Sequence, residues 1–199
     1  PHYLAPIPAM SIIQVVPKQD LGQAYKIAKF TELDSKSEFG EICHFRTTYD
    51  INLLPVNIIQ VDYKISPFNI PAEIPQGNGL QAMLTMHFQT GSPELSIRVI
   101  TETKIRLYLN LAKPYVYDLY QALFNHLVCI SVTSILNDQP IIVFAPSIIT
   151  AVGFAEDEYL LEYPENSLVG YRLLTEFFCF PEKFLFLEDR KSTRLNSSH

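Results

Sequence analysis

Residues 163–187, YPENSLVGYRLLTEFFCFPEKFLFL, decide the fold more than any other stretch of this chain. The first part has the apolar spacing of one stripe on a helix with 3.6 residues per turn. Asn166 or Ser167 can cap the first turn with a side-chain oxygen, and Pro181 requires the helix to end near Cys179. The apolar stripe comprises Leu168, Tyr171, Leu173, Leu174, Phe177 and Phe178.

Residues 184–187, FLFL, follow as a short apolar run without a polar face. Such a run is typical of a strand that is covered on both sides. An amphipathic helix, a proline corner and a buried strand in close succession predict the core of a domain. We therefore expect Tyr171, Leu174 and Phe178 to be buried in that core.

The rest of the chain predicts many short β-strands and a second helix. Pro114 suits the first position of a helix, and an apolar face continues from there to Val128. Residues 80–89 alternate between apolar and polar side chains, which indicates a half-buried antiparallel strand. The predicted fold class is therefore α+β: an antiparallel β-rich domain, sheet or sandwich, with two main amphipathic helices. Further strands are expected at 10–16, 24–30, 42–48, 50–54, 56–65 with a bulge near Gln60, 97–100, 104–110, 130–134 and 141–144.

Composition places the chain among globular proteins. Of its 199 residues, 48% are hydrophobic and 18% are charged, which is not the composition of a disordered segment. A net charge of −6 without a basic patch argues against nucleic acid as a partner. No apolar run reaches the roughly 20 residues of a membrane-spanning helix, so no membrane insertion is expected. Three separated cysteines, Cys43, Cys129 and Cys179, are predicted to be buried reduced thiols, which indicates the cytoplasm.

The sequence shows no motif for catalysis, metal binding or cofactor binding, so no residue is assigned to any of these roles. The histidines lack the spacing of metal ligands. Cys43 and His44 are adjacent in an expected strand, and adjacent strand residues point to opposite faces. Four acidic residues before the main helix are interpreted as a solvated turn near its start: Glu156, Asp157, Glu158 and Glu162.

Arg172 is the charge of most interest, because it lies inside the apolar helix. Its planar guanidinium can pair with Glu176 four residues later or with a carboxylate of a partner protein. An ordinary surface ion pair is the alternative. Arg172 and Glu176 are therefore the candidate residues for contact with a partner.

Several segments resemble one protein family, in the same order along residues 1–187. They are PHYLAPIPAMS at 1–11, CHFRTTYD at 43–50, PENSLVG at 164–170, GYRLL at 170–174, EFF at 176–178 and FPEKFLF at 180–186. Together they are similar to TssF, also called VasA or ImpG, a baseplate subunit of the type VI secretion system. Within this resemblance the signature and core residues are Gly170, Tyr171, Arg172, Leu174, Phe178, Phe180, Pro181, Glu182, Lys183 and Phe184.

The resemblance implies a structural component of a cytoplasmic baseplate wedge, which acts through protein–protein contacts and catalyses no reaction. It implies TssG, a second TssF copy, TssK and TssE as partners, and no small-molecule substrate. It also implies that residues 1–187 are an internal fragment of a longer protein, without an N-terminal helical part and a large C-terminal part. Two other interpretations stay open: a β-sandwich module that binds an unknown ligand between its sheets, and a hydrolase that uses acidic residues.

The last eleven residues, DRKSTRLNSSH at 189–199, are expected to be a non-native tail. They are polar, have no apolar period, and match in order the translation of a widely used sequencing adapter. Without this tail, which carries a net charge of +2, the charge of the chain is −8. We expect no defined place for the tail in the fold, because ordering a backbone costs about 1–2 kcal/mol per residue.

Overall fold

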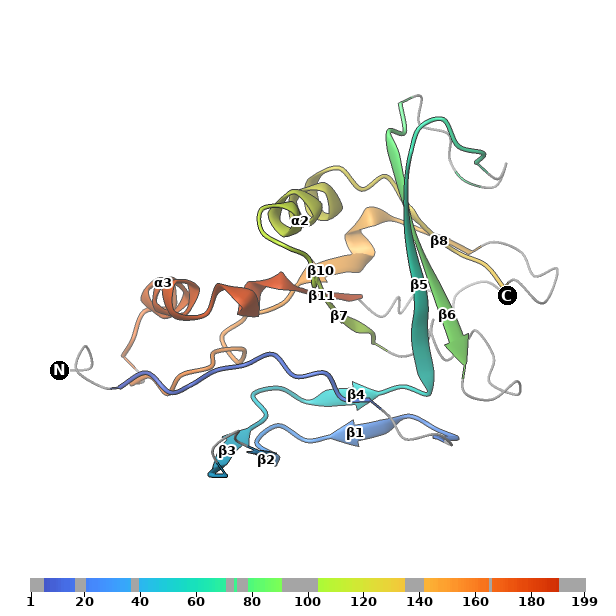
Figure 1. The fold of residues 1–199 in the computed structure, drawn as a ribbon. Coiled ribbons are helices and arrows are strands. Elements are labelled where there is room, and N and C mark those ends of the chain that lie inside the picture. The colour runs from blue at the N-terminus through green and yellow to red at the C-terminus, as the bar shows by residue number, and fades with distance from the viewer. Residues whose placement is uncertain are drawn as a thin grey trace, which may run out of the picture.

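The computed structural model describes residues 6–16, 21–36, 40–70, 74, 79–90, 104–134, 142–164 and 166–189. Over these residues every paired strand is antiparallel, and the strands form one three-stranded and four two-stranded sheets beside two α-helices. The predicted α+β class is confirmed. The described strands are divided among small sheets (Figure 1), where the sequence left open one sheet or a sandwich.

The core lies around the three-stranded sheet. In it, β11 (Phe186–Asp189) runs between β10 (Ile149–Ala151) and β7 (Arg106–Tyr108). As the middle strand, β11 has hydrogen-bonded neighbours on both sides. Leu187 of this strand is 7% exposed, so the prediction that the FLFL run is covered is confirmed for its last residue.

The segment before β11 differs from the prediction of a strand over residues 184–187. Residues Pro181–Leu185 form a short 3-10 helix, η3, and the strand begins only at Phe186. Pro181 begins this turn, where its fixed φ suits helical geometry and its missing N–H leaves no donor unpaired. Phe184 and Leu185 are nevertheless buried. The apolar run therefore predicts burial correctly, but it does not predict where the strand starts.

Asp189, expected to begin a tail without a place in the fold, is part of β11. Its backbone N–H donates to the carbonyl of Ile105 at 3.2 Å, and its Oδ1 accepts from the Ile105 N–H at 2.6 Å. Burial raises the pKa of this carboxyl above its usual value. The expectation is wrong for Asp189, because the hydrogen bonds between β11 and the segment at β7 continue to Ile105 and Asp189. Residues 190–199 lie outside the described residues.

The predicted second helix is confirmed as α2, which spans Tyr115–Asn125. Pro114 lies one position before the first helical residue, and the helix ends before the predicted Val128. It buries Val116, which is 1% exposed. Asp118 lies in its first turn, where a negative charge is favourable.

The shorter strands pair in twos. Residues 10–16, predicted as a strand, have no regular secondary structure. A run of β-prone residues becomes a strand only where a neighbour takes up its hydrogen bonds, and no described strand pairs with it. The predicted strand 97–100 lies outside the described residues. The observed pairs are β1 (Tyr25–Ile27) with β4 (Ile51–Leu53), β2 (Glu32–Lys36) with β3 (Ile42–Arg46), and β8 (Ile130–Val132) with β9 (Ile142–Phe144), while η2 (Pro146–Ile148) leads into β10.

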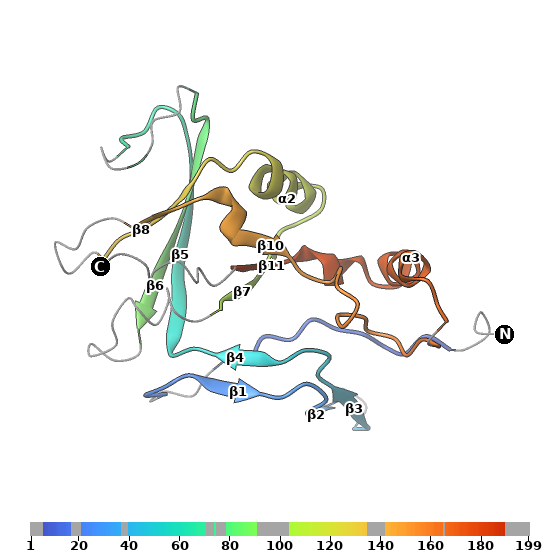
Figure 2. The ribbon, with the colours of Figure 1, turned by 180° about the vertical axis from the view of Figure 1, so that it is seen from behind.

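The two longest strands form a hairpin at one side of the molecule (Figures 1 and 2). In it, β5 (Val56–Ile65) pairs with β6 (Ala82–Thr90). The register shifts between Ile58 and Gln60. The bulge predicted near Gln60 from the change of apolar phase is therefore confirmed.

Polar contacts join the N-terminal strands to the chain just before the last helix, α3 (Val169–Cys179). These contacts link segments more than one hundred residues apart in the sequence, so they hold the small sheets to the C-terminal part. They are Tyr49 hydroxyl to the Glu158 carbonyl at 2.9 Å, Lys29 Nζ to the Asp157 carbonyl at 3.1 Å, and Arg46 to Glu162 at 2.8 Å.

We expect Leu187→Ala to lower the free energy of unfolding by about 2–5 kcal/mol, because it empties a buried position in the middle strand. Leu174→Ala, at a side chain that is 56% exposed, should change the same quantity by less than about 0.5 kcal/mol. Urea unfolding followed by circular dichroism measures both values. Equal costs for the two variants would contradict this assignment of core and surface.

Candidate protein-binding surface

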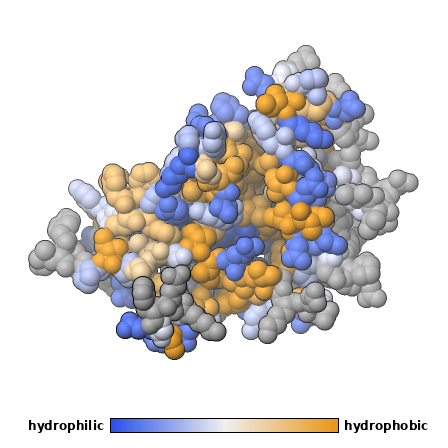
Figure 3. Space-filling view, viewed as in Figure 1, coloured by the Kyte–Doolittle hydropathy of each residue, from blue (hydrophilic) through white to orange (hydrophobic). Residues whose placement is uncertain are grey.

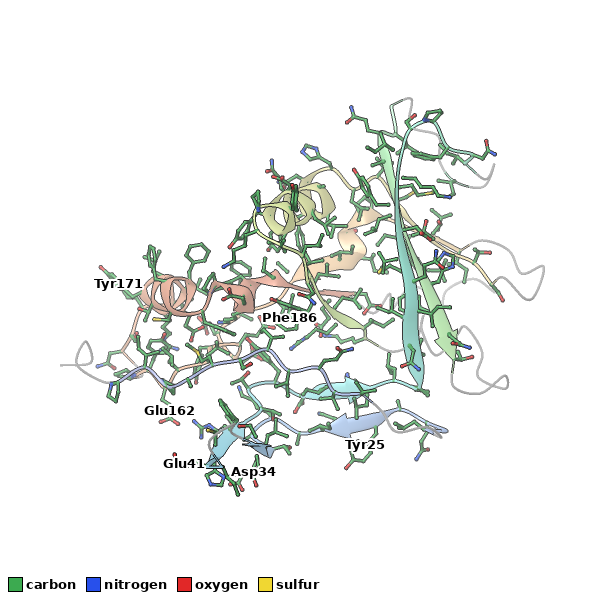
Figure 4. All side chains as sticks on the ribbon, viewed as in Figure 1. Tyr25, Asp34, Glu41, Glu162, Tyr171 and Phe186 are labelled. Atoms are coloured by element: carbon green, nitrogen blue, oxygen red, sulfur yellow. The ribbon has the colours of Figure 1, made fainter. Side chains whose placement is uncertain are left out.

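Helix α3 turns its apolar stripe toward solvent, except for Leu173, which is partly buried. The expected end at Cys179 is confirmed, but the expected burial of Tyr171, Leu174 and Phe178 is wrong, since these side chains are 66%, 56% and 80% exposed. Figure 4 shows Tyr171 on the outer side of α3, far from Phe186 in the central sheet. We call this stripe the helix face; it consists of Leu168, Tyr171, Leu174, Phe177 and Phe178.

A buried ion pair explains the orientation of the helix. Glu176, on the other side of α3, is fully buried, and Lys183 in η3 is 2% exposed. Lys183 Nζ donates to Glu176 Oε2. The second oxygen, Oε1, accepts the backbone N–H groups of Leu160 and Leu161 at 2.7 and 3.1 Å. A buried carboxylate is tolerated only where its charge and lone pairs are matched, so these partners determine which side of α3 faces inward.

Gly153 leaves room for the lysine of this pair. Its φ is +101°, a conformation that glycine adopts without strain. A Cβ atom at this position would lie 3.2 Å from Lys183 Cε, which is closer than ordinary van der Waals contact. The ammonium group also lies 5.0 Å from the centroid of the Phe184 ring, within the range of a cation–π contact.

The predicted pair between Arg172 and Glu176 does not form, because the Glu176 carboxylate is already taken. The Arg172 guanidinium lies 5.3 and 5.4 Å from the ring centroids of Tyr159 and Tyr163. It donates to the carbonyl of Pro164 at 3.2 Å. Burial, and after it the charge of Glu176, raises the pKa of Tyr163. Contact of Arg172 with a partner stays a prediction, whereas the carboxylate of Glu176 is enclosed within this chain.

The start of α3 differs from the prediction. Leu168 occupies the N-cap position and makes no side-chain hydrogen bond to the first turn. The predicted cap by Asn166 or Ser167 is wrong, because Ser167 belongs to a preceding turn in which its N–H donates to the Pro164 carbonyl at 2.9 Å. A Cβ atom at Gly170 would meet nothing within 4 Å, so packing does not explain this glycine.

The remaining signature residues stabilise the corner between α3 and β11. Phe180 follows α3 and donates its N–H to the Glu176 carbonyl at 2.8 Å. Glu182 pairs with Lys113 at 3.1 Å. A backbone hydrogen bond, and then Lys113, hold the pKa of Glu182 below its usual value. The buried ring of Phe184 lies 5.0 Å from that of Phe154. The signature residues at the corner between α3 and β11 therefore stabilise the fold, whereas Tyr171, Leu174 and Phe178 on the helix are exposed.

Glu158 corrects the interpretation of the acidic residues as a solvated turn. Its side chain is 17% exposed, and Arg106 approaches its Oε1 at 3.8 Å. Its Oε2 accepts the N–H groups of Gly153 and Ala155 at 2.7 and 3.2 Å. This carboxylate was not singled out from its neighbours in the sequence, and no local spacing distinguishes it. The three others are exposed, as expected: Glu156, Asp157 and Glu162.

The cysteines and histidines form no site in the described part of the chain. No group of three or more His, Cys, Asp or Glu residues there could hold a metal ion. Among the helices described, none has both the length and the apolar character needed to cross a membrane. Cys43 in β3 is exposed, so the predicted burial is wrong for this thiol; Cys129 and Cys179 are partly buried.

Large apolar side chains lie exposed on several elements of the described part of the chain. Figure 3 shows hydrophobic residues over α3 at the left and along the β5–β6 hairpin at the right. Contiguous exposed apolar patches mark sites where other proteins bind. The helix face is therefore the candidate binding surface.

Comparison with known proteins decides the family. The family described as "Type VI secretion system, TssF" matches residues 1–197. The chain belongs to the TssF family. The resemblance drawn from the N-terminal segment and from the GYRLL and FPEKFLF segments is thereby confirmed.

Relatives show how much of a TssF protein this chain represents. "Type VI secretion system component TssF1" of Pseudomonas aeruginosa is 28% identical over 197 residues, which cover 94% of this chain and 31% of the relative. The chain thus spans about a third of that TssF protein. It is also similar to a chain in the cryo-electron microscopy structure of the type VI secretion system TssK-TssF-TssG baseplate subcomplex. The TM-score is 0.67 at 24% identity, over 85% of this chain and 30% of that one, which shows a shared fold.

Removing one charge of the buried Glu176–Lys183 pair should strongly destabilise the protein. Glu176→Gln keeps an oxygen for the Leu160 N–H but removes the negative charge, so we expect the free energy of unfolding to fall by about 3–5 kcal/mol. Lys183→Met should cost a similar amount, because it leaves a carboxylate buried and unpaired. The double variant should be more stable than either single variant, since no buried charge remains. Strictly additive costs in urea unfolding would contradict the pairing.

Proposed function

We propose that this chain is part of a structural subunit of the type VI secretion baseplate wedge, which acts through protein–protein contacts and catalyses no reaction. The helix face supports this most directly. Five exposed apolar side chains lie on α3 and its N-cap, and a buried ion pair fixes the helix from the other side. A rigid apolar surface of this kind is typical of the central part of a protein interface. Membership of the TssF family supplies the biological context.

We propose TssG as the protein that binds the helix face, with TssK as a further partner of the same subunit. The subcomplex that contains a chain of this fold is named TssK-TssF-TssG. The helix face exposes roughly 600 Å², if each side chain offers about 200 Å² in full. That area approaches the ~800 Å² per partner of a standard interface. TssE and a second TssF copy are proposed from the family resemblance alone.

The same proposal places the protein in the cytoplasm, without nucleic acid, a small-molecule substrate or an inserted membrane segment as partner. The negative net charge supports the exclusion of nucleic acid. The ligand-binding alternative depended on a space between two packed sheets, and the described strands form small sheets. The hydrolase alternative depended on paired carboxylates in an apolar pocket. Glu158 instead accepts two backbone N–H groups, and the other three acidic side chains are exposed.

Charged substitutions on the helix face should weaken binding to TssG without unfolding the protein. In the full-length protein, we expect Leu174→Asp and Phe178→Asp each to reduce the affinity for TssG at least about tenfold, because a charge would be desolvated in the interface. Titration calorimetry with purified TssG measures the change.

Tyr25→Asp is the matched control for these variants. Tyr25 is 62% exposed, much like Tyr171, and lies on β1, away from α3 (Figure 4). It should leave the affinity for TssG unchanged. Normal binding by both helix-face variants would exclude the helix face as the TssG site.

We also propose that residues 189–199 derive from a sequencing adapter, although Asp189 continues the ladder of β11. The family match extends to residue 197 and does not separate the tail from the body, so the proposal rests on the order of residues alone. The nucleotide sequence beneath residues 189–199 tests it. Adapter codons are expected throughout, and synonymous codons of another sequence would overturn it.

A further inference from the structure

The β5–β6 hairpin has one largely apolar face. Residues opposite each other in the ladder share a face, and so do alternate residues along a strand. Over residues 58–65 and 82–88, the register therefore gathers eight apolar side chains on one side. Ile65, Tyr63 and Val61 are 71%, 62% and 56% exposed. We call this surface the hairpin face; it consists of Ile58, Val61, Tyr63, Ile65, Ala82, Leu84, Met86 and Phe88.

The opposite side of the hairpin is polar apart from Met83, and three of its polar side chains interact with one another. Gln60 Nε2 donates to both oxygens of Asp62 at 2.8 and 3.0 Å. His87 Nε2 lies 3.3 Å from Asp62 across the strands. The side chains of Asp62 and His87 are 36% and 30% exposed, less than that of Tyr63. The hairpin thus has the ordinary pattern of an amphipathic sheet, but its apolar side is the more exposed one.

The hairpin face and the helix face differ in what holds each in place. The Glu176–Lys183 pair fixes α3, so the helix keeps its orientation with its apolar stripe exposed. A two-stranded hairpin is marginally stable by itself and needs more strands or a covered apolar face. Within the described residues, β5 and β6 pair only with each other. A hairpin with no third strand among the described residues gains stability from a cover on its apolar face, and a cover on the same polypeptide is present whenever the hairpin folds.

We propose that an amphipathic segment of the same polypeptide, from outside residues 1–199, covers the hairpin face. This chain spans 31% of the TssF1 relative, so a full-length protein holds more than twice as much further chain from which such a segment can come. A segment on the same polypeptide acts at an effective concentration of about millimolar, which makes it a permanent cover. The nine residues of β6 extend about 30 Å, a length that roughly 20 helical residues match.

Hydroxyl-radical footprinting of the full-length wild-type protein tests this proposal, with mass spectrometry as the readout. In the full-length protein alone, we expect Tyr63 to be oxidised about sixfold more slowly than its 62% exposure implies, because covered core residues are less than roughly a tenth exposed. Met86, on the same face, should be protected with it. Tyr171 on the helix face should react as its 66% exposure implies until TssG is added.

Each outcome decides between the occupants. Protection of Tyr63 that persists on dilution supports a cover from the same polypeptide. Protection lost on dilution would assign the face to a second copy, and protection that needs TssG would assign it to that partner; both overturn the proposal. The Tyr171 result is separate, since the TssG proposal can fail while Tyr63 stays protected.

Two variants at neighbouring positions test which face of the hairpin the proposed segment covers. Ile65→Asp places a charge on the hairpin face and should restore oxidation of Met86 about threefold or more, because it displaces an apolar segment. Lys64→Asp changes the charge on the polar side and should leave Met86 protected. Equal Met86 oxidation in the two variants would overturn the proposal, and the wild-type measurement stands even if Ile65→Asp fails to fold.

Discussion

The ion pair between Glu176 and Lys183 sets the orientation of α3, and through it the surface that the C-terminal part presents. It connects the helix to η3 across the Pro181 corner, and Oε1 of the same carboxylate holds the backbone at residues 160 and 161. Burying either charge without the other would cost several kcal/mol, about 3–5 in measured cases. One rotation of the helix satisfies both, and that rotation sends the apolar stripe outward.

Periodicity predicted the helix and its end but not its buried side. Tyr171, Leu174 and Phe178 form a better apolar stripe than the inward residues Val169 and Leu173. A periodic pattern shows that a stripe exists, yet it does not show what covers the stripe. The buried side of α3 is determined by Lys183, which pairs with Glu176 from seven residues later in the sequence. Because Pro181 lies between them, the spacing rules of a single helix do not apply to this pair. The i+4 rule likewise suggested Arg172 as the partner of Glu176 because it assumes an exposed helix.

The core strand and the hairpin could be predicted from the sequence, because their patterns do not depend on which neighbour covers them. Phe184 and Leu187 belong to a run without any polar side, so every orientation buries apolar side chains. The phase change at Gln60 required a bulge whatever the hairpin packs against. A local pattern does not show which segment packs against it. The predicted strand at 10–16 does not form, because no described strand pairs with it. The hairpin face is exposed although apolar and polar residues alternate regularly along β6. Both the helix face and the hairpin face are exposed among the residues that the structure describes.

The position of β11 between two neighbours has a mechanical consequence. A pull on α3 that is directed along β11 passes through the five residues of η3 and enters the strand at its first residue, Phe186. Hydrogen bonds to β10 on one side and to β7 on the other then carry the load together, in shear, rather than opening one after another. The ion pair runs parallel to this covalent path and resists bending at Pro181. A force applied to the helix would therefore move the helix and the central sheet as one stiff body.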